Sequence, residues 1–422
     1  MMFARYDRSP AMTLDIRTFG CRLNSFESEV MRGHAEAANL SNTIIINTCA
    51  VTGEAERQAR QEVRRAHRAN PDATIIVTGC AAQINPQAWS ALPGVSRVLG
   101  NVEKLTPEAW TSPEPMLVAD IMQVRQTAAH LIDGFGTRAR AFIEIQQGCD
   151  HRCTFCIIPY GRGPSRSIPM GAIAAQIRTL LDHGYQEIVL TGVDLTSYGA
   201  DLPGQPKLGQ LVRRLLATLP DLPRLRLSSI DPAEIDADLW HAIEHEPRLM
   251  PHLHLSVQAG SDMILKRMKR RHLRQHVIDA THRARSLRPG IAFGADLIAA
   301  FPTEDEAMFQ DSLRLIDEAG LDYLHVFPYS ARTGTPAARI PALPMAERRA
   351  RAAQLREAGS RRLAQRLNRQ IGQTLTVLAE SSSEGHSDNF APVRFAAPVQ
   401  PGQIIHATII AATATHLIAE RA

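Results

Sequence analysis

Short apolar runs and helical stretches alternate along the first hundred residues. A first run ends at Phe19, and the runs IIIN at 44–47 and TIIVTG at 74–79 each follow a stretch of helical character, near 25–38 and 54–68. Apolar runs of this length between turn signals are typical of buried strands. Strands separated by helices predict a parallel α/β sheet.

This rhythm stops in a segment rich in proline and glycine and restarts near residue 140. Six further strands alternate with helices, which predicts a full or partial parallel barrel with its active site at the carboxyl ends of the strands. After an arginine-rich helix, short β-rich runs predict a small all-β barrel. We therefore expect an α/β domain at 12–115, a linker at 116–134, an α/β barrel at 135–368 and an all-β domain at 369–422.

The six cysteines fall into two groups of three. Cys21, Cys49 and Cys80 stand at the ends of the first three predicted strands, in FGCRLN, NTCAVT and TGCAAQ. Because the carboxyl ends of parallel strands line one edge of a sheet, we expect these thiols to converge. One buried cysteine is ordinary core packing, but three at the same topological position indicate a ligand set, here called the strand-end triad.

Cys149, Cys153 and Cys156 form a CxxxCxxC group directly after the first strand of the predicted barrel, here called the compact triad. Two kinds of metal site compete for it. Tetrahedral zinc would take His151 as a fourth ligand, whereas an iron–sulfur cluster with three thiolates keeps one iron open. Structural zinc sites more often pair two CxxC knuckles, and the sequence has no second knuckle, which favours the cluster.

Together these segments resemble the radical S-adenosylmethionine (SAM) methylthiotransferases, from about Met12 to Glu420. The resembling segments are the three strand-end cysteine elements, GCDHRCTFCIIPYGRGPSRS, LTGVDLTSYG, LHLSVQAGSD, ADLIAAFPTE and a terminal segment similar to a TRAM barrel. The resemblance implies two 4Fe–4S clusters. The compact triad would hold the one that generates a radical from SAM, and the strand-end triad would hold the one that presents sulfur, while a second SAM donates the methyl group.

Within this family the chain is most similar to the branch that modifies carbon 2 of threonylcarbamoyladenosine beside the tRNA anticodon. The resemblance therefore implies tRNA as a partner, with an electron donor and a sulfur source that the sequence does not identify. Isopentenyladenosine in tRNA and an aspartate of a ribosomal protein are alternative substrates for the same chemistry. A zinc-stabilised RNA-binding protein without catalysis is the alternative function.

The resemblance also implies a SAM pocket at the strand ends. Phe155, before the last cysteine of the compact triad, should lie beside the adenine of SAM. Thr191 and Gly192 end the second barrel strand, where the superfamily binds the methionine amino group, although an ordinary turn explains them equally well. Ser256 and Gln258 close the fourth strand, where contacts to the ribose or carboxylate are expected.

The distribution of charged residues indicates which segments contact the tRNA and the substrate. The net charge is only +4, but basic stretches at 266–274 and 345–369 favour contact with an RNA backbone. The terminal domain is slightly acidic, so its loop with Phe390 either stacks on an unpaired base or docks on the catalytic core. Arg162 and Arg166 are the arginines that we expect to meet a carboxylate-bearing substrate.

The sequence does not suggest a membrane protein. No stretch approaches the roughly 18 consecutive apolar residues of a membrane span. The first residues lack the apolar core of a secretory signal. We therefore expect a cytoplasmic enzyme.

Overall fold

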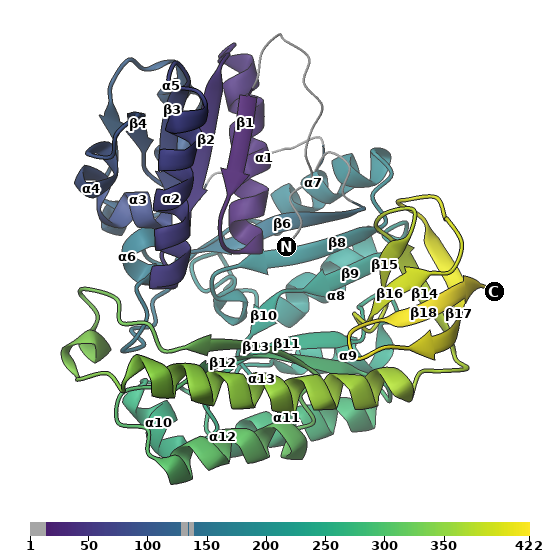
Figure 1. Ribbon diagram of the computed structural model, residues 1–422. Helices are drawn as coiled ribbons and strands as arrows, with labels where there is room; N and C mark the ends of the chain where they lie inside the picture. The colour runs from purple at the N-terminus through teal and green to yellow at the C-terminus, as the bar shows by residue number, and fades with distance from the viewer. Residues whose placement is uncertain (1–13, 128–133, 135–138) are drawn as a thin grey trace. The chain divides into compact units, whose positions relative to one another are not determined.

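The computed structural model describes residues 14–127, 134 and 139–422, which divide into two compact units. The first unit holds the residues up to 123 together with 160–162, and the second holds 124–159 and 163–422 (Figure 1). The predicted domain start at Met12 and residues 128–133 of the predicted linker lie outside the described residues.

The first unit is built on a parallel sheet in the order β1-β2-β3-β4-β5. Its strands are β1 (Leu14–Thr18), β2 (Thr43–Thr48), β3 (Thr74–Gly79), β4 (Val95–Leu99) and β5 (Met116–Leu117). Its helices are α1 (Arg22–Ala37), α2 (Gly53–Ala69), α3 (Cys80–Ile84), α4 (Pro86–Ser90) and α5 (Pro107–Thr111), with 3-10 turns η1 (Glu103–Leu105) and η2 (Ile121–Gln123). Every residue of β2 is buried, which explains its consecutive apolar residues.

The core of this unit lies between the sheet and its helices. Met31 of α1 and Trp110 of α5 join Ile45 and Ile76 of the central strands in one buried apolar cluster. Thr52 caps the start of α2, since its side chain accepts a hydrogen bond from a backbone amide of the first turn. Such a cap satisfies a donor that the helix itself leaves unpaired.

The second unit contains a partial barrel whose strands form two hydrogen-bonded groups, β7-β6-β8-β9 and β10-β11-β12-β13. The strands are β6 (Arg140–Gln147), β7 (Arg166–Ser167), β8 (Glu187–Gly192), β9 (Arg224–Leu227), β10 (Ser229–Ile230), β11 (His252–Gln258), β12 (Ala292–Ala299) and β13 (Tyr323–Pro328). All of these pairs are parallel except β6 with β7. Only Ser228 separates β9 from β10, so the two groups follow each other directly along the chain.

Helices follow the barrel strands, as the alternating pattern predicts. They are α6 (Ile158–Arg162), which ends in the first unit, α7 (Met170–Asp182), α8 (Leu208–Thr218), α9 (Ala237–His245), α10 (Asp262–Arg267), α11 (Arg274–Leu287), α12 (Glu306–Glu318) and α13 (Met345–Asn368), with 3-10 turns η3 (Leu195–Ser197) and η4 (Pro336–Arg339). Figure 1 shows α11, α12 and α13 on the same side of β11, β12 and β13.

Side chains of β12 and β13 therefore alternate between two environments. Leu297 of β12 is 1% exposed, and Leu324 of β13 packs so closely on α13 that a Cβ on Gly359 would lie 2.8 Å from it. The intervening residues, such as Asp296 and His325, point away from the helices, to the inside of the partial barrel.

The chain ends in a closed barrel in the order β14-β15-β16-β18-β17. Its strands are β14 (Thr374–Ala379), β15 (Glu384–Ser387), β16 (Pro392–Phe395), β17 (Ile404–Ala412) and β18 (Leu417–Arg421). Val377, Val393, Ala407 and Leu417 belong to its core. The predicted α/β class with a terminal all-β barrel is confirmed, while the domain limits stay a prediction. None of the helices in the described residues is long and apolar enough to cross a bilayer.

Candidate functional site

The three cysteines of the strand-end triad lie at the carboxyl ends of β1, β2 and β3. Cys21 precedes α1, Cys49 follows β2 and Cys80 opens α3. Two glycines permit their close approach: a Cβ on Gly20 would lie 2.8 Å from the Cys49 sulfur, and one on Gly79 would lie 2.3 Å from a backbone oxygen of β2. Both glycines have positive φ, so the turns that carry the thiols disfavour any side chain.

A buried ion cluster lies beside these thiols. The side chains of Glu27 and Lys104 have no exposed surface, and that of Arg162 is 2% exposed. Lys104 Nζ and Arg162 Nη2 lie 2.7 and 2.9 Å from the same oxygen of Glu27. Arg162 Nε also donates to the Cys80 sulfur at 3.0 Å. Two cations against one carboxylate leave positive charge that stabilises thiolates and anionic clusters.

Burial controls the protonation of the metal-free triad. Burial raises the pKa of Cys49 to about 12, and the neighbouring Cys80 and Cys21 add to the effect. Cys21 is the exposed member of the triad, and the surrounding protein still raises its pKa, although Arg162 opposes this shift. Because a metal binds the thiolate, loading this site must release protons.

The compact triad occupies the loop after β6, and backbone hydrogen bonds hold this loop in place. The Cys149 amide donates to the Gly163 carbonyl at 3.0 Å. Thr154, inside the triad, donates to Met268 at 3.1 Å and accepts from Ala337 at 2.9 Å. The spacing of the three thiols is therefore set by contacts on both sides of the loop.

One cysteine of the compact triad is buried and the other two are half-buried. Cys153 is 8% exposed, and Arg270 Nη1 lies 3.5 Å from its sulfur. Burial raises the pKa of Cys149, and it raises the pKa of Cys156 to about 12. As in the strand-end triad, a bound metal would compete with protons for these sulfurs.

Both triads fit an iron–sulfur cluster with one open iron, because each offers three thiols from one small region. His151, the candidate fourth ligand of a zinc site, is bonded to a carboxylate through one ring nitrogen. Its Nε2 lies 2.9 Å from Asp194 Oδ2.

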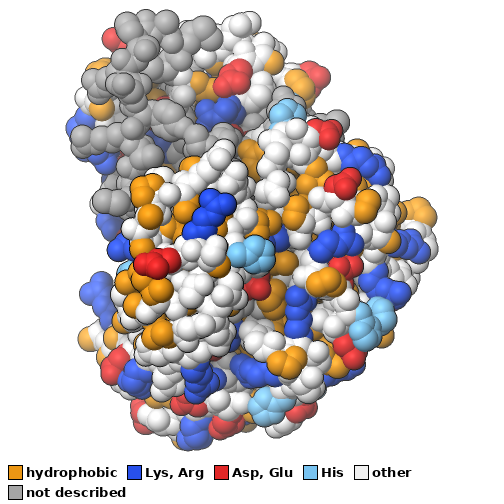
Figure 2. Space-filling model, turned by 90° about the vertical axis from the view of Figure 1, so that its right-hand side faces the viewer, with side chains coloured by type: hydrophobic (Ala, Val, Ile, Leu, Met, Phe, Trp, Pro, Cys, Tyr) orange, Lys and Arg blue, Asp and Glu red, His pale blue; other side chains and the backbone are white. Residues whose placement is uncertain are grey.

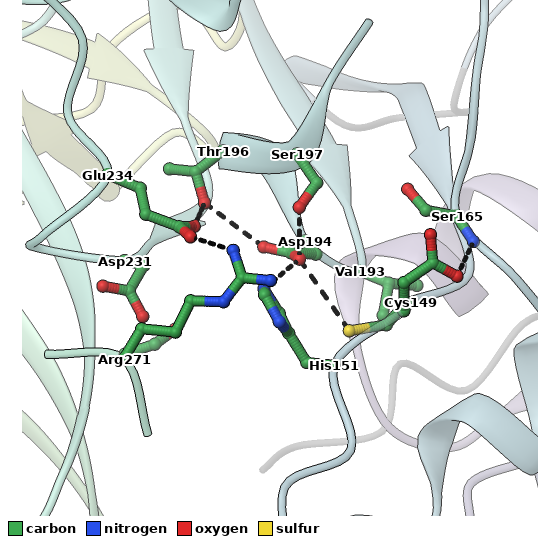
Figure 3. A network of polar contacts seen from close by, with 12 residues as sticks. Cys149, His151, Ser165, Val193, Asp194, Thr196, Ser197, Asp231, Glu234 and Arg271 are labelled. Carbon is green, nitrogen blue, oxygen red and sulfur yellow. Dashed lines mark hydrogen bonds and ion pairs between the residues drawn. The ribbon is translucent and has the colours of Figure 1, made fainter. Parts of the chain in front are cut away.

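Figure 3 shows the polar network to which this pair belongs. Asp194 follows β8, and its carboxylate lies 3.8 Å from the Cys149 sulfur. Ser197 Oγ donates to the same carboxylate at 2.6 Å. Burial raises the pKa of Asp194, but hydrogen bonds from His151 and Ser197 outweigh it, and the pKa falls below its ordinary value. A charged carboxylate therefore stands beside the compact triad.

Sequence analysis missed the carboxylates of this network. Glu234 pairs with Arg271 and accepts from Thr196 Oγ1 at 2.8 Å (Figure 3). Asp231 pairs with Arg270 at 2.8 Å. Like Asp194, both carboxylates follow the carboxyl end of a barrel strand, which is a signal that the sequence already carried.

Four of the five residues predicted for the SAM pocket stand at the same end of the barrel. Thr191 and Gly192 end β8, and Ser256 and Gln258 end β11, where the pairing register shifts and Gln258 takes a positive φ. Phe155 packs against a buried apolar cluster that includes Ile264 and Phe301. Contact of these five residues with SAM stays a prediction.

The two arginines expected to meet a carboxylate-bearing substrate are buried and bonded within the protein. Arg162 belongs to the ion cluster of the first unit. Arg166 is 4% exposed and donates to Thr127 Oγ1 at 3.0 Å and to the Pro164 carbonyl at 2.9 Å. Both arginines are therefore engaged within the protein, and their contact with a substrate stays a prediction.

Phe390 docks the terminal barrel on the α/β barrel. Its ring stacks between His252 of β11 and His386 of β15, at centroid distances of 4.7 and 4.9 Å. The Arg226 guanidinium lies 5.0 Å from the same ring. Of the two roles that the sequence left open for this residue, the structure shows docking.

Many arginines of α13 bond within the second unit. Arg351 contacts Glu304 at 2.9 Å, and Arg356 donates to the Val326 carbonyl at 3.1 Å. On the side of the molecule seen in Figure 2, basic side chains are dispersed among acidic and apolar ones. RNA contact by the basic stretches stays a prediction.

Two family models match the chain: the Radical SAM superfamily over residues 143–316 and the Uncharacterized protein family UPF0004 over residues 13–100. Among solved structures, the radical SAM methyltransferase TsrM from Kitasatospora setae shares the fold, with a TM-score of 0.54 at 15% identity over 75% of this chain and 69% of that one.

Curated relatives match over most of their length. The threonylcarbamoyladenosine tRNA methylthiotransferase MtaB of Rickettsia prowazekii is 51% identical over 94% of each chain. The MtaB of Bacillus subtilis is 36% identical over 78% of this chain and 76% of its own. A tRNA-2-methylthio-N(6)-dimethylallyladenosine synthase of Cereibacter sphaeroides is 36% identical over 80% of each. With half of its residues shared across almost the whole length, the chain belongs to the radical SAM tRNA methylthiotransferase family.

Proposed function

We propose that this enzyme transfers a methylthio group to carbon 2 of N6-threonylcarbamoyladenosine beside the anticodon of tRNA, in the cytoplasm. The compact triad would hold the 4Fe–4S cluster that acts on SAM, and the strand-end triad would hold a second 4Fe–4S cluster. When bound, these cofactors supply the radical, the methyl group and the sulfur. The domains would be 12–115, 135–368 and 369–422, joined by the linker 116–134.

The observation that carries this proposal is the grouping of all six cysteines as three and three, each set at the carboxyl ends of parallel strands. Open α/β sheets and barrels bind ligands at these ends. The 51% identity with a protein named threonylcarbamoyladenosine tRNA methylthiotransferase supports the choice of substrate.

The protein's own residues would control charge and access at the two sites. Arg162 and Lys104 place positive charge beside the strand-end triad, which favours retention of anionic sulfur ligands. Arg270, held by Asp231, stands beside Cys153 of the compact triad. Because these groups are buried and bonded to one another, they need little rearrangement when a cofactor binds.

The two-cluster proposal is tested by anaerobic reconstitution of the wild type and of two variants, Cys49→Ala and Cys153→Ala. We expect about eight irons per wild-type chain and about four in each variant, because each substitution removes a ligand from only one triad. Electron paramagnetic resonance of the reduced samples should show a different cluster remaining in each variant. Stoichiometric zinc without iron–sulfur absorption would instead support a non-catalytic zinc protein.

The substrate is tested by mass spectrometry of tRNA nucleosides from a strain that lacks this gene. We expect the methylthiolated form of threonylcarbamoyladenosine to disappear and its unmethylthiolated precursor to accumulate. Reintroduction of the wild type should restore it, whereas Cys153→Ala should not. An unchanged nucleoside pool would refute the proposed substrate, and a loss confined to the isopentenyladenosine product would reassign it.

A further inference from the structure

Three titratable side chains meet on the inner face of the partial barrel, apart from both cysteine triads. His254 of β11 donates from Nε2 to Asp296 Oδ1 of β12 at 3.0 Å. His325 of β13 places its Nδ1 3.3 Å from the same oxygen. The two imidazole rings lie 4.8 Å apart. We call these three residues the inner-face triad.

The inner-face triad is built into the sheet. In the pairing register Asp296 stands opposite His325, and His254 stands opposite Gly294. A Cβ on Gly294 would lie 2.4 Å from His254 Nδ1, so only glycine leaves room for this imidazole. The arrangement therefore depends on the backbone of three neighbouring strands, and the side chains have little freedom to move apart.

Exposure increases across the inner-face triad. The side chain of His254 is 7% exposed, that of Asp296 is 26% exposed and that of His325 is 59% exposed. Since His325 donates its Nδ1 proton to Asp296, its other nitrogen, Nε2, is available for a ligand. Asp296 thus fixes which nitrogen of His325 is presented.

The position along the strands is also informative. His252, two residues before His254, packs against Phe390 of the terminal barrel. Ser256, two residues after His254, lies near the carboxyl end of β11, where its carbonyl accepts a hydrogen bond from Arg270, which also contacts the Cys153 sulfur. At about 3.3 Å per residue, the inner-face triad lies about 7 Å from each of these levels. It is therefore on the barrel wall between the docked Phe390 and the end where the radical is generated.

Asp296 carries a negative charge in this environment. Burial raises its pKa, but the neighbouring His254 and His325 outweigh burial and lower the pKa below its ordinary value. With Nδ1 of His325 turned to this carboxylate, its Nε2 can accept a hydrogen bond from a hydroxyl group or, in the imidazolium form, donate one to an anionic group.

We propose that His325, held by Asp296 and His254, receives the hydroxyl and carboxylate end of the threonylcarbamoyl substituent and thereby selects this substrate over an adenosine with an apolar substituent. The inference rests on the proposed function. The substituents on carbon 2 and carbon 6 of adenine point in different directions. If carbon 2 faces the end of the barrel that carries the compact triad, the N6 substituent points away from that end, along the barrel wall. A polar substituent forms a hydrogen bond with His325. A dimethylallyl group would instead exclude water from His325 and offer no hydrogen bond in return.

Such a site distinguishes the two substrates mainly by weakening the binding of the apolar one. A polar group that loses its water and gains no partner typically costs about tenfold or more in affinity. The relatives of this chain include enzymes named for both substituents, threonylcarbamoyl and dimethylallyl. A residue on the barrel wall that prefers one of these substituents would contribute to separating the two activities within one fold.

The test compares His325→Leu and His325→Gln with the wild type. Each reconstituted enzyme is given anticodon stem-loops that carry either threonylcarbamoyladenosine or isopentenyladenosine, and kcat/KM is measured for both by mass spectrometry of the nucleosides. We expect leucine to lower kcat/KM for threonylcarbamoyladenosine by about tenfold or more, mostly through KM, and to narrow the preference over isopentenyladenosine. Glutamine keeps a hydrogen-bonding group, so it should recover part of the preference.

His241→Leu is the matched control, because His241 is exposed on the outer helix α9, and its substrate preference should equal that of the wild type. Iron content and circular dichroism of all variants verify folding. The inference is overturned if the leucine variant keeps the wild-type preference, or if the wild type binds zinc at this site and Asp296→Asn abolishes that zinc. Failure of the wild type to modify threonylcarbamoyladenosine would instead overturn the proposed function.

Discussion

Glu27→Gln is the most informative single perturbation of the first unit. Glu27 is the only carboxylate in the described ion cluster beside the strand-end triad, where it contacts both Lys104 and Arg162. Burial raises the pKa of Glu27, but Arg162 and Lys104 outweigh it, so the carboxyl stays ionised. Glutamine has nearly the same shape but no charge, and it would leave two cations buried without compensation.

The magnitude follows from this geometry. At the 2.7 Å between Lys104 Nζ and Glu27 Oε2, the Coulomb attraction is about 6 kcal/mol at an effective dielectric of about 20. Desolvation offsets part of it, and removing one partner of a buried pair typically costs about 3–5 kcal/mol. Because a folded domain is stable by only about 5–15 kcal/mol, this loss is a large fraction of the total.

Urea unfolding of the metal-free protein, followed by tryptophan fluorescence, measures the effect. Trp89 and Trp110 are buried in the first unit, so they report mainly on it. With an m value of about 2 kcal/mol/M, the midpoint should fall by about 1.5–2.5 M. The control Glu29→Gln removes a partly exposed ion pair on the same helix and should change stability by less than about 1 kcal/mol.

Two results would decide against this reasoning. The ion cluster would not be a major source of stability if Glu27→Gln unfolded at the same urea concentration as Glu29→Gln. The double variant Glu27→Gln/Lys104→Met removes one of the two uncompensated cations and should recover part of the lost stability. A double variant less stable than Glu27→Gln alone would contradict the electrostatic explanation.

Three further predictions concern the scaffold. Gly79→Ala should lower stability by about 1–3 kcal/mol and reduce the iron bound beside Cys80, measured by thermal unfolding and an iron assay, because alanine at φ +95° is strained and its Cβ meets backbone. Phe390→Ala should cost about 3 kcal/mol and increase tryptic cleavage before the terminal barrel. Burial raises the pKa of Glu187, but Arg226 and its neighbours lower it to about 2. Its stabilisation, about 3 kcal/mol, should therefore be complete above about pH 4.5 and disappear toward pH 2, so the stability gap between wild type and Glu187→Gln in urea unfolding should shrink as pH falls.

The sequence predicted the placement of the cysteines because that placement depends on topology. Once the apolar runs indicate parallel strands, residues at their carboxyl ends must share one edge of a sheet. That Cys21, Cys49 and Cys80 lie together at this edge then follows from the order of β1, β2 and β3 in the sheet. The terminal all-β barrel was predicted for a similar reason, since its alternating runs and turns are local signals.

Side-chain bonds between residues distant in sequence were not predicted. Arg162 follows the compact triad by a few residues, yet it bonds to Glu27, more than a hundred residues earlier. His254, Asp296 and His325 are each unremarkable in the sequence, and only the register between three strands brings them together. Such contacts depend on tertiary packing, which no local pattern specifies.

The docking of Phe390 means that the last fifty residues are more than an appendage to the catalytic chain. The aromatic ring covers His252 and the ion pair between Arg226 and Glu187 at one end of the barrel. A chain truncated after Asn368 would open that end to water. A variant that lacks the terminal strands would need other side chains to exclude water from this end of the α/β barrel.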